Sequence, residues 1–227
     1  MSADLRLVIF DVDGTLVDSQ ADILAAMTQA FERADLVPPS RNAILSIVGL
    51  SLDHAILRLV PDVPADVLGR MVDWYKEAYV GLRAKTGAAH SSPLYPGARE
   101  TIGALSGDPG VLLGVATGKS RRGLDKLIEA HSLLDVFVTL QVSDHHPSKP
   151  HPSMIEACLA ETGVLPKNAV MIGDTSFDID MAQAAGVPAI GVTWGYHPRP
   201  ALAHADVVVD RFADIRDALD LVWRQAG

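Results

Sequence analysis

The chain has 227 residues but only one cysteine, and it lacks any long apolar run. Because Cys158 has no second cysteine to pair with, an intramolecular disulfide framework is excluded and a reducing compartment is expected. The apolar stretch near the start, residues 5–10, is too short for a secretory signal or a membrane span. We therefore expect a cytoplasmic protein that has no membrane segment.

Positive charge is also scarce. There are 19 Lys and Arg residues against 28 Asp and Glu, the formal net charge is -9, and no Lys/Arg-rich block occurs. This balance argues against nucleic acid or an anionic membrane as the main partner. A charged small molecule remains compatible, because a local site can oppose the overall sign. With 48% hydrophobic residues, the chain can build one α/β domain with an insertion, or two small domains.

Four short apolar runs rich in β-branched residues predict buried strands. They cover residues 5–10, 111–116, 169–172 and 189–192. The first three end in polar or glycine-containing tripeptides and lead into helical patterns. Strands that alternate with helices in this way predict an α/β fold with a Rossmann-like parallel sheet. The carboxyl ends of such strands share one edge, where ligands bind in this class of fold.

The segment between the first two strands has apolar residues at helical spacing and no strand pattern. Helices are expected over residues 22–31, 40–48, 51–60 and 68–82. Ser40 and Ser51 are candidate N-caps. This pattern predicts an inserted helical bundle, and the Gly-, Ser- and Pro-rich residues 85–96 return the chain to the sheet. The expected domains are an α/β core and a helical insert, residues 1–16 with 93–227 and residues 17–92.

An acid pair directly follows the first predicted strand, in Asp11-Val12-Asp13-Gly14. Two carboxylates two residues apart, on a loop that Gly14 turns, can both face the crevice at the sheet edge. Like charges at that distance repel, so the pair needs a cation or a proton on one member. Asp is also common in turns and at helix N-caps, so this motif alone leaves a structural interpretation open.

Two more acids, Asp174 and Asp178, follow the predicted strand over residues 169–172. If the two strands are neighbours in the sheet, Asp174 lies beside Asp11. Three acids at one edge form a hard-oxygen site that suits Mg²⁺. The alternative is that Asp174 and Ser176 only cap the helix that follows.

Thr117, Gly118 and Lys149 are candidates for binding an anion. Thr117 and Gly118 place a hydroxyl and backbone N–H groups between a strand and a helix, an arrangement that binds phosphate. Lys149 lies between two nearby prolines on a stiffened loop, where its ammonium can meet a phosphate as a point charge. The plainer interpretations are an ordinary loop and a solvated surface lysine.

Together these motifs resemble the haloacid dehalogenase-like superfamily, subfamily IA, in its phosphoglycolate-phosphatase-like branch. The segments DVDGTLVDS (11–19), ATG (116–118), SKPHP (148–152) and GDTSFD (173–178) occur in the family's order and context. The resemblance covers the whole chain, and the helical insert resembles the family's C1-type cap domain. It implies a magnesium-dependent phosphatase that hydrolyses a small phosphate monoester through an aspartyl-phosphate intermediate.

The resemblance also implies roles for the four acids. Asp11 is then the nucleophile, and Asp13 is the general acid and base. Mg²⁺ is held by Asp11, the main-chain carbonyl of Asp13 and Asp174. Asp178 orients the ligands around the metal rather than binding it. Because Asp13 offers only its carbonyl to the metal, its side chain can keep a proton for the leaving group.

The same resemblance implies that Thr117, the Gly118 N–H and Lys149 stabilise the transferring phosphoryl oxygens. The cap should set specificity, because it closes over the crevice and excludes water. Ser51, in a segment similar to the family's substrate-contacting loop, is a candidate contact, although a helix N-cap is its default role. Arg58 is a candidate for binding a substrate carboxylate, against the usual solvated role of such residues. The substrate itself cannot be named from the sequence.

Other members of the superfamily fit the sequence less well. Asp13 argues against metal-independent dehalogenases, which lack this acid. Phosphonatases use a cap lysine, and no lysine follows the first motif closely. The β-phosphoglucomutase-like branch has a His where this chain has Ile23, so a phosphosugar mutase is the alternative to a phosphatase. A receiver-like domain or a non-catalytic phosphate-binding protein is disfavoured by the insert and the full set of acids.

Overall fold

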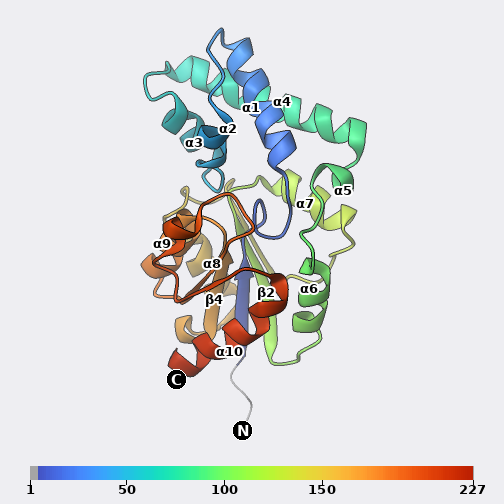
Figure 1. Ribbon diagram of the computed structural model, residues 1–227, viewed down its shortest axis with the longest axis vertical. Helices are drawn as coiled ribbons and strands as arrows, with labels where there is room; N and C mark the ends of the chain where they lie inside the picture. Colours follow the sequence, from blue (N-terminus) through green and yellow to red (C-terminus); the bar gives the residue numbers. More distant parts are fainter. Residues whose placement is uncertain (1–4, 227) are drawn as a thin grey trace.

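A six-stranded parallel sheet forms the centre of the structure, a computed structural model that describes residues 5–226 (Figure 1). The strands are β1 (Arg6–Phe10), β2 (Val111–Thr117), β3 (Thr139–Val142), β4 (Ala169–Gly173), β5 (Ala189–Val192) and β6 (Val207–Val209). Their order is β3-β2-β1-β4-β5-β6, and every pairing is parallel. β1 and β4 are therefore neighbours, and Phe10 of β1 pairs with Ile172 of β4. The residues that follow these two strands meet at one edge of the sheet.

Alternate residues of the strands pack against helices on opposite faces. From β1, Val8 and Phe10 join one apolar core, while Leu7 and Ile9 join another. The first core includes residues of α6 (Ala98–Ser106), α7 (Arg121–Ala130) and α10 (Ile215–Ala226), and the second those of α8 (Ser153–Thr162) and α9 (Ser176–Ala184). Both faces of the sheet are thus buried, which explains the continuous apolar runs in the sequence.

The chain between β1 and α6 forms a helical region beyond the carboxyl ends of the strands (Figure 1). Its helices are α1 (Gln20–Arg33), α2 (Arg41–Leu45), α3 (Leu52–Leu59), α4 (Ala65–Thr86) and α5 (Ala88–Ser91). α1 packs along α4, and α1 to α4 share a third apolar core around Met27, Ile56 and Met71. The α/β class with a parallel sheet and an inserted helical bundle is confirmed. The exact domain boundaries stay a prediction.

The sequence pattern missed the edge strands β3 and β6. β3 reads Thr-Leu-Gln-Val. Its buried Gln141 donates a hydrogen bond from Nε2 to the hydroxyl of the buried Thr139 at 2.8 Å. β6 has only three residues. Polar residues interrupt β3, as an edge strand permits, and β6, although it reads Val-Val-Val, is too short to stand out in the sequence. The expected linker at residues 85–96 also contains regular structure, because α4 extends to Thr86 and α5 follows it.

The longest helix, α4, has 22 residues and carries charged side chains along its length, among them Arg70, Asp73 and Glu77. Within residues 5–226, no helix combines the length and apolar character that crossing a bilayer requires.

Candidate active site

The loop after β1 carries Asp11 and Asp13 and folds back on itself. The Gly14 N–H donates to the carbonyl oxygen of Val17 at 2.9 Å. Gly14 has a φ of +91°, and a Cβ there would collide with the Asp174 carboxylate. Glycine is therefore needed both for the turn and for the approach of the loop to Asp174. The carboxylates of Asp11 and Asp13 on this loop have different hydrogen-bond partners, Lys149 for Asp11 and Ser19 with Lys119 for Asp13.

Lys149 lies buried between Asp11 and Asp178. Its Nζ donates to Asp11 Oδ1 at 2.7 Å and to Asp178 Oδ1 at 2.6 Å. Burial by itself would lower the pKa of Lys149, but the two carboxylates outweigh this effect and raise it. Asp178 Oδ2 accepts from the N–H and the hydroxyl of Thr175, in a capping box that starts α9. Lys149 is thus held inside the site and is not a solvated surface residue.

Asp174 follows β4 and is fully buried beside the loop after β1. Its Oδ1 accepts from the Thr15 hydroxyl at 2.9 Å, and its Oδ2 accepts from the Tyr196 N–H at 2.7 Å. Burial, with the charges of Asp178 and Asp11, raises the pKa of Asp174 well above its usual value. Thr175, and not Asp174 or Ser176, is the N-cap of α9. The alternative that Asp174 only caps this helix is therefore wrong.

Asp11, Asp174 and Asp178 form a cluster that fits a cation. One carboxylate oxygen from each lies within 4.8 Å of the other two. Burial raises the pKa of Asp11 to about 7, although Lys149 opposes the rise; Asp178 adds to it. Asp11 Oδ2 is buried and has no hydrogen-bond partner among the described residues. Lys149 contacts two of the three carboxylates, so the acids of the cluster outnumber its ammonium, and Asp11 has an oxygen available for a metal or a substrate.

Asp13 is held by groups of its own. Its Oδ1 accepts from the Ser19 hydroxyl at 2.5 Å, and its two oxygens accept from Lys119 Nζ at 2.9 and 2.8 Å. Lys119 also lies 3.4 Å from the Tyr79 hydroxyl of α4. Burial would lower the pKa of Lys119, but Asp13 and Tyr79 outweigh it and raise the pKa. Both carboxylate oxygens of Asp13 therefore contact one ammonium, whereas the resemblance implied a side chain available to the leaving group.

Lys119 is a site residue that was not predicted from the sequence. It directly follows Thr117 and Gly118 in the same loop, where the sequence pattern predicts only an anion-binding turn. Its partner Asp13 lies 106 positions away, so the contact depends on β1 and β2 being neighbours in the sheet. The signal available in the sequence was a lysine directly after a predicted strand end.

Thr117 and Gly118 lie at the end of β2 beside the helical region. The Thr117 hydroxyl accepts from the Lys119 N–H at 3.2 Å. A Cβ at Gly118 would come within 2.5 Å of the Gly49 carbonyl oxygen and 2.7 Å of that of Leu50. Gly118 therefore permits the backbones of two distant segments to touch. Thr117 and Gly118 both line the same cavity as Asp11 and Asp13.

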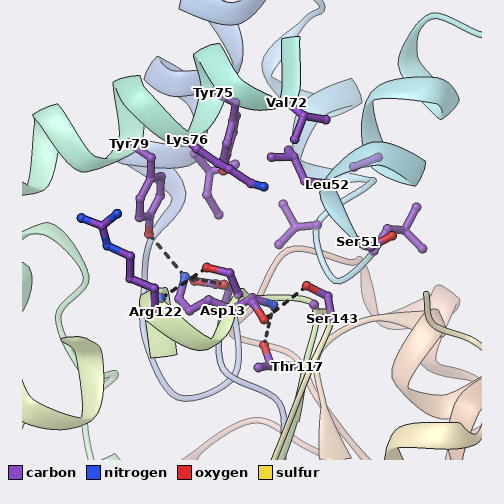
Figure 2. Close-up of a pocket in the computed structure, with 18 of the residues that line it drawn as sticks. Asp13, Ser51, Leu52, Val72, Tyr75, Lys76, Tyr79, Thr117, Arg122 and Ser143 are labelled. Carbon is purple, nitrogen blue, oxygen red and sulfur yellow. Dashed lines mark hydrogen bonds and ion pairs between the residues drawn. The ribbon is translucent and has the colours of Figure 1, made fainter. Parts of the chain in front are cut away.

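This cavity, of about 680 Å³, lies between the sheet edge and the helical region (Figure 2). Asp11, Asp13 and Thr117 form its floor, and residues of α1, α3 and α4 line the other side. Its volume is within the range of about 300–1,000 Å³ that is typical of small-molecule sites. The combination of a buried acid cluster, ammonium groups and a cavity can bind an anionic small molecule next to a cation.

Of the two candidate substrate contacts in the helical region, Ser51 lines the cavity and Arg58 does not. Ser51 lines the cavity, its N–H donates to the Ser148 hydroxyl at 2.9 Å, and its own hydroxyl donates to Asp53. It makes no side-chain N-cap hydrogen bond, unlike Ser40, which accepts from the Ala43 N–H. The Arg58 guanidinium lies over the Phe177 ring and is not among the described residues that line the cavity.

Residues 8–192 match the haloacid dehalogenase-like hydrolase family. The chain is 34% identical over 214 residues to probable phosphatase IndB of Dickeya dadantii (strain 3937), with 92% of this chain and 91% of the relative covered. It is 30% identical over 241 residues to phosphoglycolate phosphatase of Escherichia coli (strain K12), with 96% and 94% covered. These alignments include both the sheet and the helical region.

Among solved structures, the fold is similar to that of a predicted phosphoglycolate phosphatase from Haemophilus somnus 129PT. The TM-score is 0.83 at 27% identity, with 96% of this chain and 99% of the other covered. The similarity extends over nearly the whole of both chains, so the helical region is part of the shared architecture.

Proposed function

The chain belongs to the haloacid dehalogenase-like hydrolase family, and from this premise we propose that it is a magnesium-dependent phosphatase acting on a small-molecule phosphate monoester through an aspartyl-phosphate. The observation that carries the proposal is the buried Oδ2 of Asp11, a residue of the cavity floor, which has no hydrogen-bond partner within residues 5–226. A carboxylate oxygen that is desolvated and has no hydrogen bond is well suited to attack phosphorus.

The donor set of the acid cluster fits Mg²⁺. Asp11, Asp174 and the main-chain carbonyl of Asp13 would hold the ion, and all three are hard oxygen donors. When bound, Mg²⁺ supplies positive charge that neutralises the nucleophile and the phosphate oxygens. Asp178 is better placed to orient the others, because its two oxygens already accept from Lys149 and Thr175.

In the first step, Asp11 attacks phosphorus, the bond from phosphorus to the ester oxygen breaks, and the alcohol leaves with a proton from Asp13. Lys149 keeps Asp11 in position through Oδ1 and leaves Oδ2 available. The Thr117 hydroxyl, the Gly118 N–H and Lys149 are proposed to stabilise the transferring oxygens. In the second step, Asp13 takes a proton from water, which attacks the same phosphorus and releases phosphate and Asp11.

Lys119 Nζ contacts both oxygens of Asp13, so Asp13 can reach the leaving oxygen only after these contacts have loosened. Lys119 lines the cavity, so an anionic group of the substrate can draw its ammonium away from Asp13. We therefore propose that Lys119 is a positioning residue. It holds the Asp13 side chain in place and releases it when substrate binds.

A phosphatase is favoured over a phosphosugar mutase by Ile23. This residue lies on α1 among those that line the cavity, at the sequence position where the mutase branch has a His. An aliphatic side chain there cannot relay a proton to a sugar hydroxyl. We retain the cytoplasm as the proposed location, on the single cysteine.

The test is release of phosphate from p-nitrophenyl phosphate with Mg²⁺ and with a chelator. We expect activity only with the metal, and loss of at least about 10⁴-fold in turnover for Asp11→Asn. Asp217→Asn, which makes the same change on the exposed face of α10, is the control and should retain activity. Activity in Asp11→Asn comparable to the control would refute the assignment of the nucleophile.

A further inference from the structure

The cavity remains large although the helical region already contacts the sheet region on two sides. On one side, the Ser51 N–H donates to the Ser148 hydroxyl, and His197 Nε2 lies 3.1 Å from the Ser46 carbonyl oxygen. On the other side, α5 contacts α7 and Arg83 Nη1 donates to the Gly123 carbonyl oxygen. The volume of about 680 Å³ therefore lies within a docked arrangement of the two regions.

The helical side of this cavity carries a set of apolar side chains that we call the apolar roof. It consists of Leu50, Leu52, Val72, Tyr75 and Tyr79. All five are only partly buried, although they pack against the core of the helical region. The rings of Tyr75 and Tyr79 stack with centroids 5.9 Å apart, and Figure 2 shows both above Asp13. Apolar surface that faces a cavity lowers the free energy when a ligand covers it.

The size of the cavity excludes a close fit to the smallest phosphate esters. A volume of about 680 Å³ holds about twenty water molecules at roughly 30 Å³ each. A phosphate with a two-carbon leaving group would occupy the floor near Asp11 and Thr117 and leave the apolar roof in contact with water. Lys76 of α4 also lines the cavity, so an additional anionic substituent on a larger ligand is compatible with the roof.

We propose that the preferred substrates are phosphate monoesters whose alcohol part carries an apolar or aromatic body that packs against the apolar roof. This inference rests on the proposed function, because it assigns the phosphate to the floor of the same cavity. It distinguishes the chain's substrate class from that of an enzyme adapted to a two-carbon acid. The apolar contact provides affinity, and the floor provides the chemistry.

The experiment is calorimetric binding of ethyl-, butyl- and hexylphosphonate to the protein with Mg²⁺. These phosphonates have a C–P bond in place of the ester linkage and cannot be hydrolysed there. Their dissociation constants therefore report contacts and not leaving-group chemistry. We expect the dissociation constant to fall by about threefold to fourfold for each added methylene, the value for full burial of a CH₂ group. A constant that does not change with chain length, or rises with it, would overturn the inference.

A pair of variants on α4 localises the effect. Val72→Trp places an indole in the apolar roof and should remove the advantage of hexyl over ethylphosphonate while leaving ethylphosphonate binding within about threefold of wild type. Asp73→Trp adds the same bulk at the next, exposed position and should keep the advantage. Equal loss in both variants would contradict the roof as the site. The series on the wild-type protein decides the question even if Val72→Trp does not fold.

Hydrolysis of acetyl phosphate separates this inference from the proposed function. Acetyl phosphate is small and its leaving group needs little protonation, so its Mg²⁺-dependent cleavage reports the floor alone. If acetyl phosphate is cleaved but the phosphonate dissociation constants do not change with chain length, the proposed substrate class is wrong and the phosphatase assignment stands. If acetyl phosphate is not cleaved but the dissociation constants fall with chain length, the phosphatase assignment is wrong and the apolar contact stands.

Discussion

The floor and the roof of the cavity hold their side chains in opposite ways. Asp11 of the floor and the adjoining Asp174 and Lys149 are at most 2% exposed, and each is fixed by charged or hydrogen-bonded partners. On the roof, Val72 and Tyr75 of α4 are partly exposed, and their surroundings are mainly apolar. Directed polar contacts specify positions to fractions of an ångström, whereas apolar contacts specify volume. Under the proposed function, the sheet edge carries the reaction and the helical region selects the molecule that undergoes it.

Replacing Lys149 by Met is the strongest test of whether its ammonium stabilises the buried acids next to the floor. Asp11 and Asp178 would then be buried without a cation, and we expect the free energy of unfolding to fall by about 3–5 kcal/mol. Urea denaturation without Mg²⁺ measures this change. Lys167→Met, at an exposed position, should cost less than about 0.5 kcal/mol. A loss in the Lys149 variant as small as in the control would show that the floor does not depend on this ammonium.

Asp13→Asn should separate chemistry from stability on the same floor. We expect turnover to fall by about 10²–10⁴-fold, because both the acid and the base steps lose their proton carrier. The first step should slow less with acetyl phosphate, whose leaving group needs little protonation. Rapid-quench trapping measures each step. Unimpaired formation of the phosphoenzyme from an alkyl phosphate would rule out Asp13 as the acid.

Gly118→Ala tests whether the contact between floor and roof is needed. The added Cβ would meet the carbonyl oxygens of Gly49 and Leu50 and push the helical region away. We expect kcat/KM to fall by about 10–100-fold, since displacements of an ångström have effects of this size. Gly103→Ala, in α6 with open space around it, should leave kinetics unchanged. Equal kinetics in the two variants would show that the docked arrangement is not required.

The smallest expected effect concerns His197, which joins the same two regions. Its Nδ1 accepts from the Ser176 N–H at 3.2 Å, and its Nε2 contacts the Ser46 carbonyl oxygen, so the neutral ring is required. Burial lowers the pKa of His197 from 6.5, although the Ser46 contact opposes this. Its contribution to stability is therefore fully present above about pH 6.5 and is lost as the pH falls through the lowered pKa.

His197→Phe provides the measurement, because Phe retains a ring beside Phe177 and cannot titrate. We expect the stability difference between wild type and variant to shrink by less than about 1 kcal/mol between pH 7.5 and 5.5. Urea denaturation of both proteins at several pH values measures it, and other titrating groups cancel in the difference. A difference that does not vary with pH would show that His197 does not carry this contact.

The sequence predicted the fold class and the central strands because buried parallel strands produce continuous apolar runs. It also selected Asp11, Asp174 and Lys149, since each stands directly after a strand or on a rigid loop. It missed β3, whose apolar pattern is interrupted by polar residues at the sheet edge, and β6, which has only three residues. Arg58 was a weak candidate because an arginine on a helix has no pattern that separates a ligand contact from a ring contact.

The amino-acid sequence by itself determined the order of strands and helices, the placement of acids at strand ends and the lone cysteine, because these depend on local pattern and count. Only the tertiary structure decided that Lys119 pairs with Asp13, that Asp11 Oδ2 has no hydrogen-bond partner among the described residues, and that the apolar roof faces the cavity. These facts depend on which strands are neighbours and how closely two distant backbones approach, and such distances are set by packing across the whole chain.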